Sequence, residues 1–367
     1  MISNENILEI RARNFYEKKN NFKKYEDVKS IKEYGELKNV LITIVMPIYN
    51  HPDFCLERSL LSAINQKGFD NYQILLVDND SDNKYHNDEV IKKMKSDKIV
   101  YFRNQQNIGM FGNWNRCIYL AKSEWICFLH SDDMIKENAL NVLSNIVSNH
   151  PEIDQLACLA EDYNSSENSE ELFLQYTAKK DINEVSVKRI FESYYYDSMY
   201  TTVKCALLKK NYMLELGGFR DLSDGIGVDD YICMLKYAHY YKTYQADALL
   251  YSNGWGENES LNTAHWYPEM IANYYMQKFV YKNKRLRFLY SRRSISMLYD
   301  KAKKYNSGKN FAGRIIPVDI DEMVNDCGII IGKIPVIDLL IRKGMTLLIK
   351  LFREMKIESF KIKIINN

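Results

Sequence analysis

The chain has 367 residues, a length that predicts more than one structural unit. Lys and Arg total 50 and Asp and Glu total 48, so the formal net charge is only +2. This balance excludes a uniformly polycationic or polyanionic protein, although it allows charge to be segregated along the chain. Hydrophobic residues make up 46% of the sequence, which is enough for a sizeable core and excludes disorder of the whole chain.

The cysteines and the apolar segments indicate the cellular compartment in which the protein is expected. Seven cysteines are scattered along the sequence without a CxxC pair, which excludes a zinc ribbon and favours a reducing cytoplasm. No segment approaches the roughly 18–20 consecutive apolar residues that a spanning helix needs. The N-terminus lacks the apolar core of a signal peptide. We therefore expect a cytoplasmic protein rather than an integral transporter or a multi-pass synthase.

The N-terminal part changes character near residue 39. Residues 1–38 are rich in Lys, Glu and Asn and are predicted to form a charged helical extension. Residues 40–46 (VLITIVM) have the continuous apolar pattern of a strand that is buried on both faces. Pro47 is predicted to end this strand, and Asn50 to cap the helix that follows.

Strands and helices are then predicted to alternate as far as about residue 150. The expected strands are residues 72–77, 99–102 and 125–129, and the expected helices are residues 87–94, 112–121 and 136–147. This alternation predicts an α/β domain with a largely parallel, doubly wound sheet. Ligands of such sheets bind at the carboxyl ends of the strands. From about residue 261 the chain is predicted to be mostly helical.

Three acidic turns are candidates for chemistry. Asp78 follows a predicted strand, and so does the pair Asp132-Asp133, whereas Asp229-Asp230 follows a glycine-containing segment. Each has an ordinary structural explanation as a turn former or a helix cap. The functional alternative is that adjacent carboxylates bind Mg²⁺ or Mn²⁺ on a phosphate substrate, and that Asp230 is a general base.

The order of these segments carries a family resemblance. Residues 45–50 (VMPIYN) resemble the opening VPxYN segment of family 2 glycosyltransferases, which have the GT-A fold. Residues 77–81 (VDNDS) are similar to their VDDGS, and residues 128–133 (FLHSDD) to their FLDSDD. Further matches are Asn107-Ile108-Gly109 with Asn115, the GGF segment at 217–219 and the EDY-like segment at 228–231. The resemblance covers about residues 40–250.

This resemblance implies a GT-A domain over residues 39–260, with a Rossmann-like mixed sheet that binds a nucleotide sugar, most often a UDP-sugar. In it Asp78 would accept a hydrogen bond from the base, and Asp133 would ligate Mn²⁺ or Mg²⁺, with Asp132 and His265 as further candidate ligands. The implied donor-binding residues are Pro47, Tyr49, Asp78, Asn107 and Asp132. His130 replaces the first Asp of the usual motif, and we expect it to be a hydrogen-bond partner rather than a ligand.

For the acceptor side, the resemblance implies that Asp230 deprotonates the attacking hydroxyl in one inverting displacement. The implied acceptor region comprises Gly218, Phe219, Asp229 and Trp255, although packing explains Trp255 equally well. The QxxRW signature of processive synthases is absent, which favours the addition of one sugar. The expected acceptor is a saccharide or lipid-linked saccharide of bacterial surface-polysaccharide assembly.

The C-terminal region is basic. Between Lys278 and Arg314 there are twelve Lys or Arg residues against one acid. Residues 261–367 are therefore predicted to form a helical region that meets an anionic membrane, on the inner face of the plasma membrane. A core-packing helix with a solvated basic face is the alternative. Two other functions stay open: nucleic-acid binding through residues 278–314, although no nucleic acid is expected, and nucleotide-sugar binding without catalysis. The sequence predicts no oligomeric state.

Overall fold

The computed structural model describes residues 22–164, 177–195, 203–204, 206–219 and 229–255, with the single residues 18, 20, 280, 344 and 347. Almost all of the predicted basic region 261–367 lies outside this description. The predicted boundary at residue 260 therefore stays a prediction, and so does the boundary at residue 38.

Four parallel strands form the centre of the sheet. They are β2 (Val40–Ile48), β3 (Tyr72–Asp78), β4 (Ile99–Asn104) and β5 (Ser123–Phe128). Their order is β4-β3-β2-β5, so the direction of winding reverses between β2 and β5. Because of this reversal, the carboxyl ends of β2, β3 and β5 border the crevice in which doubly wound sheets bind their ligands.

Antiparallel pairings extend the sheet on both sides, β1 with β4 and β9 with β5, whereas β7 and β10 pair parallel to each other, so the sheet is mixed, as the family resemblance implied. The order over the described residues is β1-β4-β3-β2-β5-β9-β7-β10-β6, and β8 pairs with β10. The strands outside the centre are β1 (Ser30–Tyr34), β6 (Met134–Ile135), β7 (Gln155–Asn164), β8 (Thr177–Glu184), β9 (Ala206–Lys209) and β10 (Thr243–Trp255).

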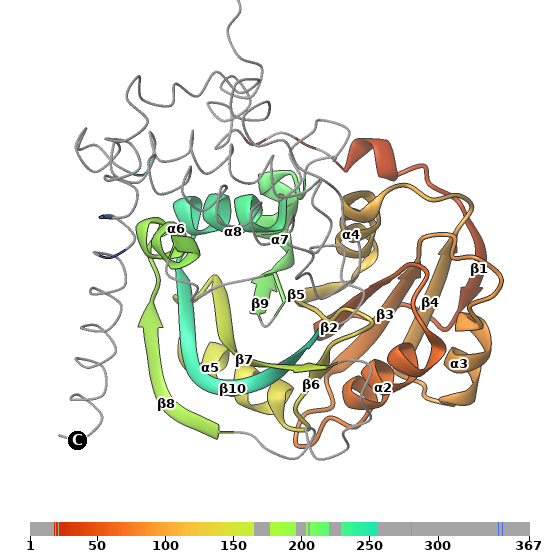
Figure 1. Cartoon of the computed structure of the whole chain (residues 1–367), viewed down its shortest axis with the longest axis horizontal. Coiled ribbons are helices and arrows are strands. Elements are labelled where there is room, and N and C mark those ends of the chain that lie inside the picture. The colour runs from red at the N-terminus through yellow and green to blue at the C-terminus, as the bar shows by residue number, and fades with distance from the viewer. Residues whose placement is uncertain are drawn as a thin grey trace, which may run out of the picture.

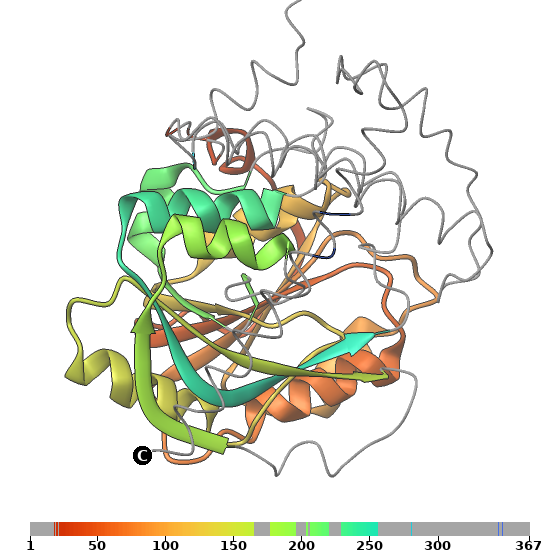
Figure 2. The same cartoon turned by 60° about the vertical axis from the view of Figure 1, so that its left-hand side comes forward.

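Helices cover both faces of the sheet (Figures 1 and 2). One face carries α2 (Asp53–Ile64), α3 (Asn87–Lys93) and α5 (Ala139–Asn149), and the other carries α4 (Met110–Leu120), α7 (Lys210–Leu216) and α8 (Asp229–Tyr240). Helix α6 (Val187–Tyr195) lies beside α8, and a 3-10 helix, η2 (Lys23–Tyr25), lies beside α4. Within the described part of the chain, no helix combines the length and the apolar character needed to cross a membrane.

The core is divided by the sheet because successive side chains of a strand point to opposite faces. On β2, Ile44 and Met46 join the cluster beneath α2 and α5, whereas Val45 packs with the cluster beneath α4 and α8. All three side chains are fully buried. This explains why the sequence of a central strand is apolar throughout rather than alternating.

Three local expectations differ from the structure. Residues 30–34, expected in a helical extension, form the edge strand β1, which pairs antiparallel with β4. Pro47 lies inside β2 rather than ending it, because the pairing of β2 with β5 stops at Val45 and no backbone donor is needed on that side beyond this point, while the pairing with β3 continues. Asn50 does not cap α2; its side-chain oxygen accepts a hydrogen bond from the amide of Asp82 at 2.8 Å.

Candidate functional site

The loop between β5 and β6 holds the acidic pair. Strand β6 starts directly after Asp133 and pairs with β10 through Met134 and Ile135. From α2, the hydroxyl of Ser59 donates a 2.5 Å hydrogen bond to the carbonyl of Asp133. At the start of the loop, the Tyr251 hydroxyl donates to the carbonyl of Phe128 at 2.8 Å. The loop is therefore fixed by two strands and a helix.

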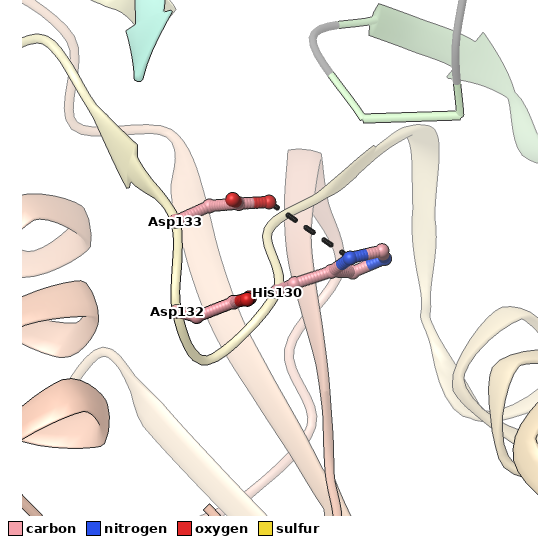
Figure 3. A group of neighbouring side chains, drawn as sticks. All are labelled: His130, Asp132 and Asp133. Carbon is pink, nitrogen blue, oxygen red and sulfur yellow. Dashed lines mark ion pairs between the residues drawn. The ribbon is translucent and has the colours of Figure 1, made fainter. Parts of the chain in front are cut away.

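Three side chains of this loop converge. His130, Asp132 and Asp133 each offer one possible metal-ligating atom, and these atoms lie within 4.8 Å of one another. Figure 3 shows the three side chains projecting to the same side of the loop, with the His130 ring facing the Asp133 carboxylate. Asp132 is 8% exposed and Asp133 is fully buried. The structure thus brings together the acidic pair that the sequence indicated and adds His130 to it.

Asp133 is the most enclosed member of this group. Its Oδ1 accepts a 2.9 Å hydrogen bond from the amide of Gly254 in β10. Its Oδ2 lies 3.1 Å from Lys204 Nζ and 3.8 Å from His130 Nδ1. Burial raises the pKa of Asp133, the Lys204 ammonium opposes that rise, and the neighbouring Asp132 carboxylate adds to it.

Burial also shifts the pKa values of Asp132 and His130. Burial raises the pKa of Asp132, against the opposing charges of Lys204 and Arg58. The backbone carbonyl of Asp132 accepts a 2.5 Å hydrogen bond from the Tyr163 hydroxyl. The ring of His130 lies 4.7 Å from that of Trp114, and burial holds the pKa of the imidazole well below its usual range. His130 is therefore neutral near pH 7.

These residues fit a divalent cation. Two carboxylates supply the oxygen ligands that Mn²⁺ and Mg²⁺ prefer, and the neutral imidazole is itself a potential ligand. Asp133 Oδ2 makes no hydrogen bond in the described part of the chain, although it is buried. It already lies 3.1 Å from the Lys204 ammonium, so a divalent cation bound here would share or displace that positive charge.

Asp78, at the end of β3, is fully buried and already has three donors. Its Oδ1 accepts from the amide of Ser81 at 2.8 Å, and its Oδ2 accepts from Asn87 Nδ2 at 3.1 Å and from the Tyr101 hydroxyl at 3.0 Å. This carboxylate therefore organises the turn after β3. Its predicted contact with a base stays a prediction.

Asn107 belongs to an amide network behind the same turn. Its Oδ1 accepts hydrogen bonds from Asn79 Nδ2 and from the amide of Gly109, both at 2.8 Å. Asn79 Oδ1 accepts in turn from the amide of Ile108 and from Asn104 Nδ2. The predicted donor residue Asn107 is thus a loop-forming residue in this structure.

Pro47 and Tyr49 lie at the end of β2. Pro47 pairs with Val77 of β3, next to Asp78. Tyr49 follows the strand, and 46% of its surface is exposed. Both residues therefore lie at the carboxyl ends of the central strands, the edge of the sheet at which the donor is predicted to bind.

The GGF segment, residues 217–219, ends helix α7 and packs against helix α4. Gly217 and Gly218 have positive φ angles of 87° and 67° and end α7, and a Cβ on Gly218 would lie 2.3 Å from Asn115 Oδ1. The Asn115 amide donates to the carbonyl of Phe219 at 2.7 Å and accepts from its N–H at 2.8 Å. Phe219 is fully buried among the rings of Phe111, Trp114 and Phe128. Gly218 and Phe219 therefore fix the position of this turn, and any contribution that they make to an acceptor region is through that position.

The remaining predicted residues are described only in part. Asp230 lies in the first turn of α8, and its Oδ1 accepts a 2.8 Å hydrogen bond from the amide of Tyr231. The side chains of Asp229 and Trp255 and the whole of His265 lie outside the described residues.

Lys204 was not singled out by the sequence. It reaches Asp133 because residue 204 forms a parallel bridge with Phe128 at the end of β5. Arg58, which is buried on α2 and lies 4.9 Å from the ring of Tyr163, was missed as well. The signal available for Arg58 was a cationic side chain among the inward-facing positions of a helix, where Arg is rarely buried without a partner.

Comparison with known proteins identifies the class. Residues 43–217 match the family described as Glycosyl transferase family 2. This match confirms, over these residues, the resemblance seen in the sequence.

Individual relatives match over part of their length. The chain is 30% identical over 124 residues to an uncharacterised glycosyltransferase of Methanocaldococcus jannaschii, covering 33% of this chain and 42% of that protein. It is 32% identical over 108 residues to the poly(ribitol-phosphate) beta-N-acetylglucosaminyltransferase TarP of Staphylococcus aureus, covering 28% of this chain and 32% of TarP. The chain thus spans less than half the length of these two relatives.

A solved structure confirms the fold. Residues 1–349 of S. aureus TarS, determined in complex with UDP-GlcNAc, match with a TM-score of 0.56 at 14% identity. The match covers 88% of this chain and 92% of that one. The predicted GT-A fold, with its mixed α/β sheet, is therefore correct.

Proposed function

We propose that the protein is an inverting, metal-dependent glycosyltransferase. It transfers one sugar from a nucleotide diphosphate sugar, a UDP-sugar, to a hydroxyl of a saccharide or lipid-linked saccharide acceptor. The observation that carries this proposal is the buried pair Asp132-Asp133 at the carboxyl end of β5, beside the reversal between β2 and β5 in a family 2 domain. Anionic diphosphates and divalent cations meet at such sites.

Two relatives support the nature of the substrates. TarS has been determined with UDP-GlcNAc, and the name of TarP describes the transfer of N-acetylglucosamine to poly(ribitol-phosphate). These substrates favour a uridine nucleotide as donor and a bacterial surface polymer, or its lipid-linked precursor, as acceptor for this chain. The particular sugar and linkage depend on side chains that line the acceptor side.

The reaction assigns distinct tasks to the residues. The Asp230 carboxylate takes the proton of the acceptor hydroxyl while that oxygen attacks the anomeric carbon. The bond from this carbon to the diphosphate oxygen breaks on the opposite face, so the configuration inverts. Asp132 and Asp133 would hold Mn²⁺ or Mg²⁺, which neutralises the charge that builds up on the leaving diphosphate. Pro47, Tyr49, Asp78 and Asn107 border or shape the donor side.

The other interpretations rest on different residues. Nucleic-acid binding and membrane association both depend on the basic region beyond residue 260, outside the described part of the chain, and they stay predictions. A nucleotide-sugar-binding protein without catalysis would keep the donor site and lack turnover, so a turnover assay separates it from the proposed enzyme.

The test is a panel of nucleotide sugars with Mn²⁺, in which release of the nucleoside diphosphate is measured with and without saccharide acceptors. We expect release from one donor, and near-complete loss in Asp230→Asn with folding retained. Glu152→Gln is the control, because Glu152 is an exposed acid paired with His150 after α5. Full activity of Asp230→Asn would contradict the assignment of the base, and no release from any donor would contradict the function.

A further inference from the structure

His130 is the residue at which this chain departs from the acidic motif that it otherwise follows. Its Nδ1 lies 3.8 Å from Asp133 Oδ2, and one of its ring nitrogens lies within the 4.8 Å group formed with Asp132 and Asp133. The inference drawn from it rests on the proposed function, because it concerns the cation of that same site.

The other ring nitrogen of His130 is also informative. Nε2 is buried and has no hydrogen-bond partner in the described part of the chain. Asp133 Oδ2, which lies 3.8 Å from His130 Nδ1, is likewise buried and makes no hydrogen bond in the described residues, although it lies 3.1 Å from the Lys204 ammonium. Buried polar atoms nearly always have a hydrogen-bond partner, so the edge that His130 Nδ1 shares with Asp133 Oδ2 retains polar atoms that a bound cation could contact.

We propose that His130 is a metal ligand together with Asp132 and Asp133, and that this mixed donor set makes the site select divalent transition-metal ions over Mg²⁺. Mg²⁺ favours an all-oxygen shell, whereas a nitrogen ligand strengthens binding in the order Mg²⁺, Mn²⁺, Co²⁺. This differs from the sequence-based expectation that His130 is a hydrogen-bond partner, because the structure places its ring among the ligand atoms.

The direct experiment uses the full chain with Mn²⁺ alone. Electron spin echo envelope modulation detects a nitrogen nucleus that is bonded to the Mn²⁺ ion. We expect a ¹⁴N coupling in the wild type that disappears in His130→Asp and in His130→Asn. The control is His150→Asn, because His150 forms a similar pair with Glu152 at 3.1 Å, outside the cluster, and this variant keeps the coupling.

Affinities give the second readout. Dissociation constants for Mn²⁺ and Mg²⁺ are measured by competition in the wild type, His130→Asp and His150→Asn. We expect the preference for Mn²⁺ over Mg²⁺ to fall about tenfold in His130→Asp, which corresponds to about 1.4 kcal/mol, and to persist in His150→Asn. The aspartate variant is expected to bind Mg²⁺ more tightly than the wild type, because an oxygen ligand replaces nitrogen.

The outcomes separate this inference from the proposed function. Bound Mn²⁺ without ¹⁴N coupling in the wild type overturns the ligand assignment, even where the variants fail to fold. A preference within about twofold of the wild type in folded His130→Asp overturns the claim of selectivity. Turnover of the nucleotide sugar is measured separately. If turnover is observed, either of these two results overturns the inference about His130 and leaves the proposed function unaffected.

Discussion

Lys204 Nζ lies 3.1 Å from Asp133 Oδ2 and 3.4 Å from Asp133 Oδ1, across 71 residues of sequence. The carboxylate is fully buried, whereas the Lys204 side chain is 25% exposed. The ammonium therefore stands where a cation bound by Asp133 would stand. It compensates the buried charge without a metal, and a divalent ion at Asp133 would compete with it.

The first prediction concerns this ion pair. Lys204→Gln removes the compensating charge, and the free energy of unfolding without metal is expected to fall by about 2–3 kcal/mol. Mn²⁺ is expected to recover more stability in the variant than in the wild type, because the ion no longer displaces an ammonium and binding to the native state is stabilising. Urea unfolding with and without Mn²⁺ measures both effects.

A matched pair provides the control for that prediction. Lys209 Nζ lies 3.0 Å from Asp154 Oδ1, its side chain is 20% exposed, close to the 25% of Lys204, and Asp154 is not part of the metal-binding group. Lys209→Gln is expected to lower stability without changing the increment that Mn²⁺ adds. An equal Mn²⁺ increment in wild type, Lys204→Gln and Lys209→Gln would contradict the competition.

The second prediction concerns the link between α4 and the GGF turn. Asn115→Ala leaves both the N–H and the carbonyl of buried Phe219 without their partner, which is expected to cost about 2–4 kcal/mol. Asn145→Ala, at an exposed position on α5, is expected to change stability by less than about 0.5 kcal/mol. Chemical denaturation compares the two. Similar small losses in both variants would show that the turn does not depend on Asn115.

The third prediction concerns Asp80, which has a φ of 63° at the place where the family motif has glycine. Its side chain also accepts a 3.1 Å hydrogen bond from Arg103. Asp80→Gly and Asp80→Ala both lose that bond, but only glycine adopts this backbone conformation freely. Asp80→Gly is therefore expected to be more stable than Asp80→Ala by about 1 kcal/mol in thermal or urea unfolding. Equal stabilities would argue against backbone strain at this position.

Local patterns predicted the centre of the fold. The apolar runs at β2, β3 and β5 identify strands buried on both faces, and their acidic ends identify the edge at which Asp78, Asp132 and Asp133 lie. These assignments succeed because burial on both faces and polar strand ends are local properties of the sequence.

The structure differs from the sequence-based predictions where contacts between residues far apart in the sequence determine the local conformation. Strand β1 is polar and mostly exposed, so its five residues carry no strand pattern, and only their pairing with β4 makes them a strand. Asn50 bonds to Asp82, 32 residues further on, in preference to the helix that it precedes. Lys204 reaches Asp133 through a bridge to Phe128. The periodicity of apolar residues in a short stretch of sequence cannot predict such long-range contacts.

The most direct test of the central claim is release of the nucleoside diphosphate from a nucleotide sugar by wild-type protein and by Asp133→Asn, with Mn²⁺ present. The account predicts release by the wild type and a loss of about 100-fold or more in Asp133→Asn, while cooperative unfolding is retained, because the leaving diphosphate is no longer neutralised. Release at the wild-type rate by folded Asp133→Asn would contradict the proposed role of the His130-Asp132-Asp133 site.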